Sequence, residues 1–213
     1  MDKTQDLYEF KIISLGDSGV GKTSIFKVYT QKKFDDDTLS TIGLAFAETE
    51  YILNTKEKVR LKLVDTGGQE KYKSLAKNYY KNADGALFVF AHNDKESFEH
   101  IIEWIKLFDE NCNNKDIPKF LIRNKNDLKK FDEQESFDDF IKEHNILRYI
   151  STSAKNNINI SETFKEMAEI INLQYNKSGK QYNKVLVKTE KKEPKKEKKL
   201  FLLYSRNTIK FNE

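Results

Sequence analysis

The sequence of 213 residues has a single cysteine, Cys112, and it has no apolar run approaching the ~18–20 residues that cross a bilayer. One cysteine cannot form a disulfide within the chain, so a disulfide framework is excluded and a reducing compartment is expected. We expect no transmembrane helix and, because residues 1–6 contain no apolar h-region, no secretory signal. Asp at position 2 predicts no N-myristoylation, and the lack of cysteine in residues 209–213 predicts no prenyl anchor. From the expected reducing compartment we expect a cytoplasmic protein.

Glycine is also scarce. The chain has 8 glycines, where the average usage of ~7% would give about 15. Six of the eight lie in three short segments, at 16, 19 and 21, at 43, and at 67 and 68. Such clustering indicates backbone that takes a positive φ or lies very close to a ligand.

Charge is distributed unevenly along the chain. Residues 177–213 carry twelve Lys and Arg against four Glu, a net charge of +8, whereas residues 1–176 carry a net charge of −4. Hydrophobic periodicity stops near residue 177, and residues 188–199 are almost entirely Lys and Glu. We therefore predict one domain over residues 1–176 and a basic, largely disordered tail over 177–213, with a short apolar segment at 200–204.

Strand and helix patterns alternate within the predicted domain. Alternating or fully apolar runs predict strands at residues 7–15, 45–53, 59–64, 86–91, 119–122 and 146–150. Amphipathic spacing predicts helices at 22–31, 69–82, 95–111, 133–144 and 161–175. Only the second and third strands are joined by a hairpin, so the pattern predicts an α/β fold in three layers whose sheet is mostly parallel, with one antiparallel strand.

Residues 16–23, Gly-Asp-Ser-Gly-Val-Gly-Lys-Thr, fit the pattern G-x-x-x-x-G-K-[ST] between a predicted strand and a predicted helix. In this context the backbone N–H groups and the helix N-terminus bind phosphates. Lys22 is placed to reach the β- and γ-phosphates, and the Thr23 hydroxyl to bind Mg²⁺. This motif, which we call the phosphate loop, indicates a nucleoside triphosphate but not its base.

A second motif, Asn124-Lys125-Asn126-Asp127, follows a predicted buried strand, at the edge where open α/β sheets bind ligands. The Asp127 carboxylate can accept both N1–H and the exocyclic amine of guanine, whereas adenine offers neither donor in that arrangement. Adenine would leave the carboxylate unpaired, so such a site rejects the wrong base. The pair of motifs therefore favours a guanine nucleotide.

Three further segments complete the pattern. Asp65, at the end of the third strand, is placed to hold Mg²⁺ through water, Gly68 to donate its N–H to a γ-phosphate, and Gln69 to orient an attacking water. Thr41 is a candidate second hydroxyl ligand of Mg²⁺, and Phe34 is a candidate cover for one face of the base. In residues 151–155, the Ala154 N–H is placed to contact guanine O6, with the Lys155 and Lys125 stems on the two faces of the base.

These motifs, in this order, resemble small GTPases of the Ras superfamily, most closely the Rab family, over residues 7–175. The resemblance implies the P-loop GTPase fold, with a six-stranded sheet flanked by five helices, Mg²⁺ with GDP or GTP, and slow GTP hydrolysis. It implies catalytic roles for Gln69, Lys22, Thr41 and Gly68, and metal ligation by Thr23, Thr41 and, through water, Asp65. The implied nucleotide-binding set is Asp17, Ser18, Gly19, Val20, Gly21, Lys22, Thr23, Ser24, Phe34, Thr41, Gly68, Asn124, Lys125, Asp127, Ser153, Ala154 and Lys155.

The resemblance also implies partners. Effectors, an exchange factor and a GTPase-activating protein would bind through residues 34–46 and 67–80, two loops that order around the γ-phosphate. Val64 stands where Rab proteins usually have Trp, and Gly67 stands where they usually have Ala. These departures leave the identity of the effector undetermined. No residue of the motifs supplies an arginine finger, so intrinsic turnover should be slow.

Several alternatives stay open. The chain could be a nucleotide-bound scaffold that never cycles, or an ATP-binding protein, which the N-K-x-D motif disfavours. The lysines of the tail could bind an anionic membrane, which would place the protein peripherally on the membrane surface, or they could bind an acidic protein or filament. The alternative is that the tail is a solvated linker. We do not expect nucleic-acid binding, because no reading module accompanies the lysines. The three histidines have no metal-ligand spacing and are expected at the surface or in helix packing.

Overall fold

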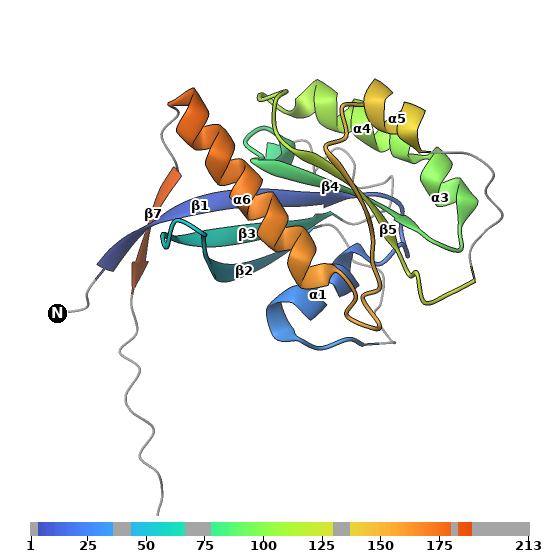
Figure 1. Ribbon diagram of the computed structural model, residues 1–213, viewed down its shortest axis with the longest axis horizontal. Coiled ribbons are helices and arrows are strands. Elements are labelled where there is room, and N and C mark those ends of the chain that lie inside the picture. The colour runs from blue at the N-terminus through green and yellow to red at the C-terminus, as the bar shows by residue number, and fades with distance from the viewer. Residues whose placement is uncertain (1–3, 36–43, 67–77, 130–136, 180–182, 189–213) are drawn as a thin grey trace, which may run out of the picture.

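The computed structural model of the chain describes residues 4–35, 44–66, 78–129, 137–179 and 183–188 (Figure 1). Strands and helices alternate, as the sequence predicts. In chain order they are β1 (Thr4–Leu15), α1 (Lys22–Gln31), β2 (Leu44–Ile52), β3 (Lys58–Thr66), β4 (Gly85–Ala91), α3 (Lys95–Glu99), α4 (Ile101–Asn111), β5 (Lys119–Asn124), α5 (Asp138–Glu143), β6 (Arg148–Ser151), α6 (Ile160–Ser178) and β7 (Asn183–Lys188).

The central sheet has the strand order β2-β3-β1-β4-β5-β6. The ladders β3–β1, β1–β4, β4–β5 and β5–β6 are parallel, and the hairpin partner β2 is antiparallel to β3. The predicted six-stranded, mostly parallel sheet with one antiparallel strand is thereby confirmed. Because the parallel strands all point the same way, their carboxyl ends lie at one edge of the sheet, to the right in Figure 1.

A seventh strand lies where the sequence predicts a tail. β7 is antiparallel to β1, with Thr4 opposite Lys188 and Glu9 opposite Asn183. Tyr8 and Glu9 pair with both β3 and β7, so β7 lies on the β4 side of β1, before β4 begins. α6 runs to Ser178 and β7 to Lys188, both beyond the domain boundary that the sequence predicts at residue 176. The long β1 offers backbone groups that β7 satisfies.

The sheet separates two apolar cores, one under each helical layer. Phe10 and Ile12 of β1 belong to the core that α1 and α6 cover, whereas Ile13 and Leu15 belong to the core that α4 covers. This alternation follows from the two-residue period of a strand. β4 and β5 are buried along their whole length, as expected for strands covered on both faces. The expectation of a three-layer α/β fold is confirmed.

Three of the predicted helices are either divided in the structure or lie partly outside the described residues. The pattern predicts one helix over 95–111, but the structure divides it at His100, whose carbonyl accepts hydrogen bonds from both Glu103 N and Trp104 N. An amphipathic pattern does not register such a break, because His100 keeps helical torsion angles. Residues 69–77 of the helix predicted at 69–82 lie outside the described residues, and so do residues 133–136 of the helix predicted at 133–144. Within the part of the chain that the structure describes, no helix is both long and apolar enough to cross a bilayer.

Candidate nucleotide-binding site

The phosphate loop connects the end of β1 to the first turn of α1, and it is shaped by two glycines with close neighbours. Gly16 has φ +142°, and a Cβ there would lie 2.1 Å from the Val89 carbonyl oxygen. Gly21 has φ +97°, and a Cβ there would lie 2.3 Å from Asn124 Nδ2. Any other residue at these positions would collide with the backbone of β4 or with the Asn124 side chain at the end of β5. The glycines therefore fit the loop tightly between two neighbouring strands.

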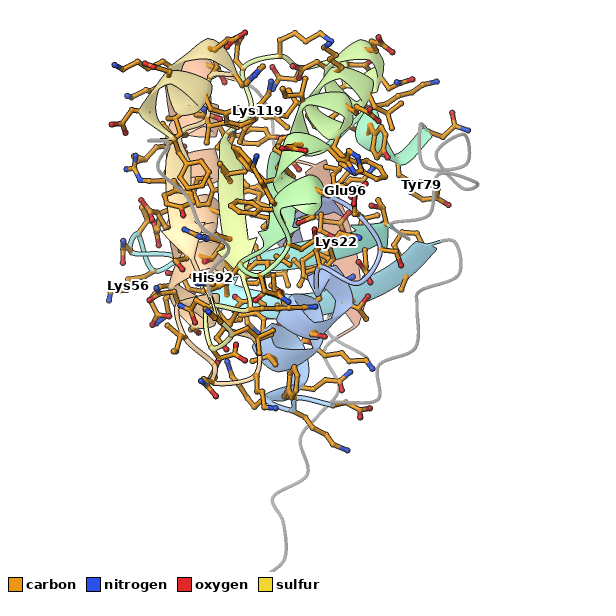
Figure 2. All side chains as sticks on the ribbon, turned by 90° about the vertical axis from the view of Figure 1, so that its right-hand side faces the viewer. Lys22, Lys56, Tyr79, His92, Glu96 and Lys119 are labelled. Atoms are coloured by element: carbon orange, nitrogen blue, oxygen red, sulfur yellow. The ribbon has the colours of Figure 1, made fainter. Side chains whose placement is uncertain are left out.

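Lys22, the first residue of α1, is buried, and it projects back into the phosphate loop. Its Nζ donates to the carbonyl oxygens of Gly16 at 2.8 Å and Asp17 at 2.7 Å. Burial lowers the pKa of the Lys22 ammonium to about 8, against the opposing effect of the Asp65 and Asp17 carboxylates. Figure 2 faces the carboxyl ends of the strands and shows Lys22 near the centre of this side. A buried cation in a loop of backbone N–H groups is suited to bind an anion.

Hydroxyl and carboxylate oxygens meet beside this lysine. Thr23 Oγ1 donates a hydrogen bond to Asp65 Oδ2, and Ser14 Oγ donates to Asp65 Oδ1 at 3.3 Å. Asp65 lies near the end of β3, next to Ser14 in the β1–β3 ladder, and it is 3% exposed. Thr66 is tied to the same place, since its hydroxyl donates to the Ser14 carbonyl at 2.7 Å. These oxygen donors are of the kind that Mg²⁺ prefers.

Asn124, at the end of β5, links the phosphate loop to the loop after β6. Its Nδ2 donates to the Val20 carbonyl of the phosphate loop at 2.9 Å. Its Oδ1 accepts from Thr152 Oγ1 and from the Ala154 N–H, each at 3.2 Å. Both ends of the amide are therefore engaged within the protein, and Asn124 is 1% exposed. The sequence predicts a nucleotide contact for this residue, whereas the geometry adds a structural role in fixing the loops around the site.

Asp127 lies exposed after the sharp turn at Lys125, which has the left-handed φ of +63°. Ser153 Oγ donates to Asp127 Oδ1 at 2.5 Å, and Ser153 Oγ also accepts the Asn156 N–H at 3.0 Å. The serine thus orients the carboxylate. Sequence reasoning expects Ser153 to bind the nucleotide directly, but in the structure it also positions Asp127.

One cavity of about 330 Å³ brings the predicted motifs together. It joins the phosphate loop, the residues after α1, the N-K-x-D segment and the loop after β6. Its lining is Gly19, Gly21, Ser24, Phe34, Asp35, Asn124, Lys125, Asp127, Leu128, Ala154 and Lys155. We call it the strand-end cavity. Of the other predicted nucleotide-binding residues, Asp17, Ser18, Val20, Lys22 and Thr23 belong to the adjoining phosphate loop, and Ser153 follows β6.

The remaining predicted residues, Thr41, Gly68 and Gln69, lie outside the described residues, as do parts of the two predicted partner-binding segments. The described part of those segments includes an aromatic pair. Phe46 of β2 is 50% exposed, and its ring centroid lies 5.4 Å from that of Tyr79.

Two residues near the site escape the sequence motifs. The Asp17 carboxylate contacts His100, at the junction of α3 and α4, and Trp104 of α4. His100 is partly exposed at the surface, as the sequence predicts, and its ring also contacts the phosphate loop 83 residues earlier. No periodicity or local motif indicates a pair so distant in the sequence.

A family model described as "Ras family" matches residues 11–173 of this sequence. The chain belongs to the Ras family. The match spans every described element of the site, from β1 into α6, and it confirms the resemblance found from the motifs. Proteins of this family bind GTP and GDP with Mg²⁺, hydrolyse GTP, and act through effectors, exchange factors and activating proteins.

Individual relatives point to the Rab proteins. Ras-related protein Rab-11B of Dictyostelium discoideum is 37% identical over 166 residues, covering 77% of this chain and 74% of the relative. Ras-related protein Rab-32 of Sus scrofa is 36% identical over 195 residues, covering 89% of this chain and 86% of the relative. Ras-related protein Rab-10 of Diplobatis ommata is 37% identical over 171 residues, with coverages of 79% and 84%. The chain is thus a Rab-like small GTPase.

Proposed function

We propose that this Rab-like GTPase is a switch in membrane traffic, with its guanine nucleotide bound in the strand-end cavity and the phosphate loop. The observation that carries the proposal is the convergence of both motifs on one cavity. Gly19 and Gly21 of the phosphate loop line it together with Lys125 and Asp127 of the N-K-x-D segment. A ligand that spans the cavity would place phosphates at one end and a base at the other.

The base end is suited to guanine. Asp127 is exposed, and Ser153 holds one of its oxygens at 2.5 Å, which fixes the plane of the carboxylate. Ala154 and the lysines at 125 and 155 line the same end of the cavity. A fixed carboxylate pairs with the N1–H and amino group of guanine and is left unpaired by adenine, which costs affinity.

The phosphate end is suited to a magnesium–nucleotide complex. Lys22 has three N–H donors, and two of them are held by the Gly16 and Asp17 carbonyls, so the third remains for a phosphate oxygen. Thr23 and Asp65 already share a hydrogen bond, and this hydroxyl and carboxylate fit Mg²⁺, which takes oxygen ligands and keeps several waters. In the proposed site Thr23 and Thr41 bind the metal, and Asp65 holds it through water. When bound, Mg²⁺ neutralises charge on the phosphates.

Hydrolysis, in this proposal, depends on positioning and electrostatics. Gln69 orients the attacking water, and Thr41 and Gly68 respond to the γ-phosphate. Lys22 stabilises the charge that develops on the transferred phosphoryl group. A GTPase-activating protein supplies the missing arginine, and effectors bind residues 34–46 and 67–80, where the exposed Phe46 and its neighbour Tyr79 offer an apolar contact. Peripheral attachment to an anionic membrane through the basic residues beyond 188 belongs to the same proposal.

Base competition tests the site assignment. Labelled GDP bound to the purified protein should be displaced by unlabelled GDP and GTP, and much less by ATP. Asp127→Asn should weaken GDP binding by at least about a hundredfold, because the amide offers a donor where guanine also offers one. Asp139→Asn, a matched change at an exposed aspartate of α5, should leave it unchanged. Displacement by ATP as effective as that by GTP would refute the guanine assignment.

A further inference from the structure

The Asp17 side chain connects the phosphate loop to the helices on one face of the sheet. Asp17 Oδ2 lies 2.7 Å from His100 Nδ1, and Trp104 Nε1 donates to Asp17 Oδ1 at 2.7 Å. An ionised carboxylate can only accept hydrogen bonds, so Nδ1 carries the proton in this contact. Both oxygens of Asp17 are thus held from the junction of α3 and α4.

The same residue also positions the lysine that binds phosphate. The backbone carbonyl of Asp17 accepts a 2.7 Å hydrogen bond from Lys22 Nζ. Asp17 therefore joins, within one residue, the contact with His100 and an acceptor of Lys22. Trp104 is 2% exposed and anchored in the core, so it gives the contact a rigid base. The His100 side chain is 42% exposed and can exchange protons with solvent.

We propose that His100 is a positioning residue for the phosphate loop, and that its imidazolium, with the Trp104 indole, holds Asp17 so that nucleotide is released more slowly at acidic than at alkaline pH. The inference rests on the proposed guanine-nucleotide site. Two effects act in the same direction. The charged ring forms a stronger hydrogen bond to Asp17 than the neutral ring does. It also compensates a carboxylate charge that would otherwise repel the phosphates.

The surroundings of His100 favour its charged form. Among the described residues, the acidic groups facing it are Asp17 from the phosphate loop, Glu96 from α3, whose Oε1 lies 3.9 Å from Nε2, and Glu103 from α4. The hydrogen bond to Asp17 raises the pKa of His100 above its ordinary value, against the opposing effect of burial. The contact is therefore fully charged below the ordinary histidine pKa and loses its charge as pH rises through the raised pKa.

His100→Asn is the test variant, because the asparagine Nδ2 can occupy the place of the histidine Nδ1 and donate to Asp17 without titrating. We would measure release of labelled GDP between about pH 5.5 and about pH 8.5 and take the ratio of variant to wild-type rates at each pH. This ratio cancels the protonation of the nucleotide itself. It should be about three at the acidic end, as for a partly exposed ion pair, and should fall to about one at the alkaline end. His144→Asn is the matched control, since His144 packs on Phe140 of α5, and its ratio should stay near one.

Two measurements make the outcome decisive. On an Asp17→Asn background, the His100 substitution should change the release rate at no pH. In an NMR titration of the purified protein, Asp17→Asn should lower the pKa of the His100 ring, whether or not a guanine nucleotide is bound. An unchanged His100 pKa, or a His100→Asn ratio that is the same at every pH, would overturn the proposal. Failure of the wild type to bind GDP would instead refute the nucleotide site, and the titration would still decide the contact.

Discussion

Asn124→Ala should destabilise the free protein and loosen the whole site, because one amide holds the phosphate loop and the loop after β6 together. The change removes bonds of 2.9, 3.2 and 3.2 Å to Val20 O, Thr152 Oγ1 and the Ala154 N–H, all of them buried. At about 1 kcal/mol for each bond, the free energy of unfolding should fall by about 3 kcal/mol. With a urea m-value of about 2 kcal/mol/M, the unfolding midpoint should fall by about 1.5 M.

The assay is urea unfolding of protein freed of nucleotide with a chelator, followed by a GDP titration of the same samples. GDP affinity should fall by at least about tenfold, because the ligand must then order loops that Asn124 no longer holds. Asn126→Ala is the matched control: Asn126 bonds to the Thr152 carbonyl through its backbone N–H, which alanine keeps, so its midpoint should stay close to the wild-type value. A loss of less than about 0.5 kcal/mol in Asn124→Ala would refute the cross-link.

Three further changes test other parts of the account. Gln69→Leu should slow GTP hydrolysis at least about tenfold in a phosphate-release assay while leaving nucleotide affinity nearly unchanged, and equal rates would remove Gln69 from the mechanism. Gly16→Ala should prevent folding or destabilise by more than about 3 kcal/mol, since its Cβ would collide with Val89 O, whereas Gly19→Ala, with open space around its Cβ, should cost about 1 kcal/mol in thermal melts. Tyr175→Phe removes the 2.5 Å hydrogen bond to Asp84 and should cost about 1–2 kcal/mol at neutral pH. Because burial raises the pKa of Asp84, that cost should shrink as pH falls through this pKa, and an equal cost at all pH values would contradict the assignment.

The sequence predicts the parts of the fold that repeat a simple pattern. The fully apolar residues 86–91 and the alternation of β1 predict buried strands, and the glycines at 16 and 21 mark a loop that the structure shows wedged against Val89 and Asn124. The phosphate loop could be predicted because its function needs consecutive residues. The same holds for the N-K-x-D segment, whose residues line the strand-end cavity.

Contacts between distant segments could not be predicted in this way. The ring of His100 meets Asp17 across 83 residues, and Ser153 orients Asp127 across 26. β7 could not be predicted for a different reason. Its Asn-Lys-Val-Leu-Val-Lys sequence lies in a stretch dominated by lysine, and the strand depends on pairing with β1 at the N-terminal end of the chain. Charge composition predicts solvation, but a strand can form wherever a long edge offers unpaired backbone groups.

The central claim, that the chain binds guanine nucleotide and turns GTP over, is tested most directly by chromatography of the nucleotide released from the freshly purified, denatured protein. The account predicts mostly GDP, since a GTPase with slow release retains its product. Mostly GTP would mean that binding persists without hydrolysis and would favour a non-cycling scaffold. An adenine nucleotide, or no nucleotide at all, would contradict the account.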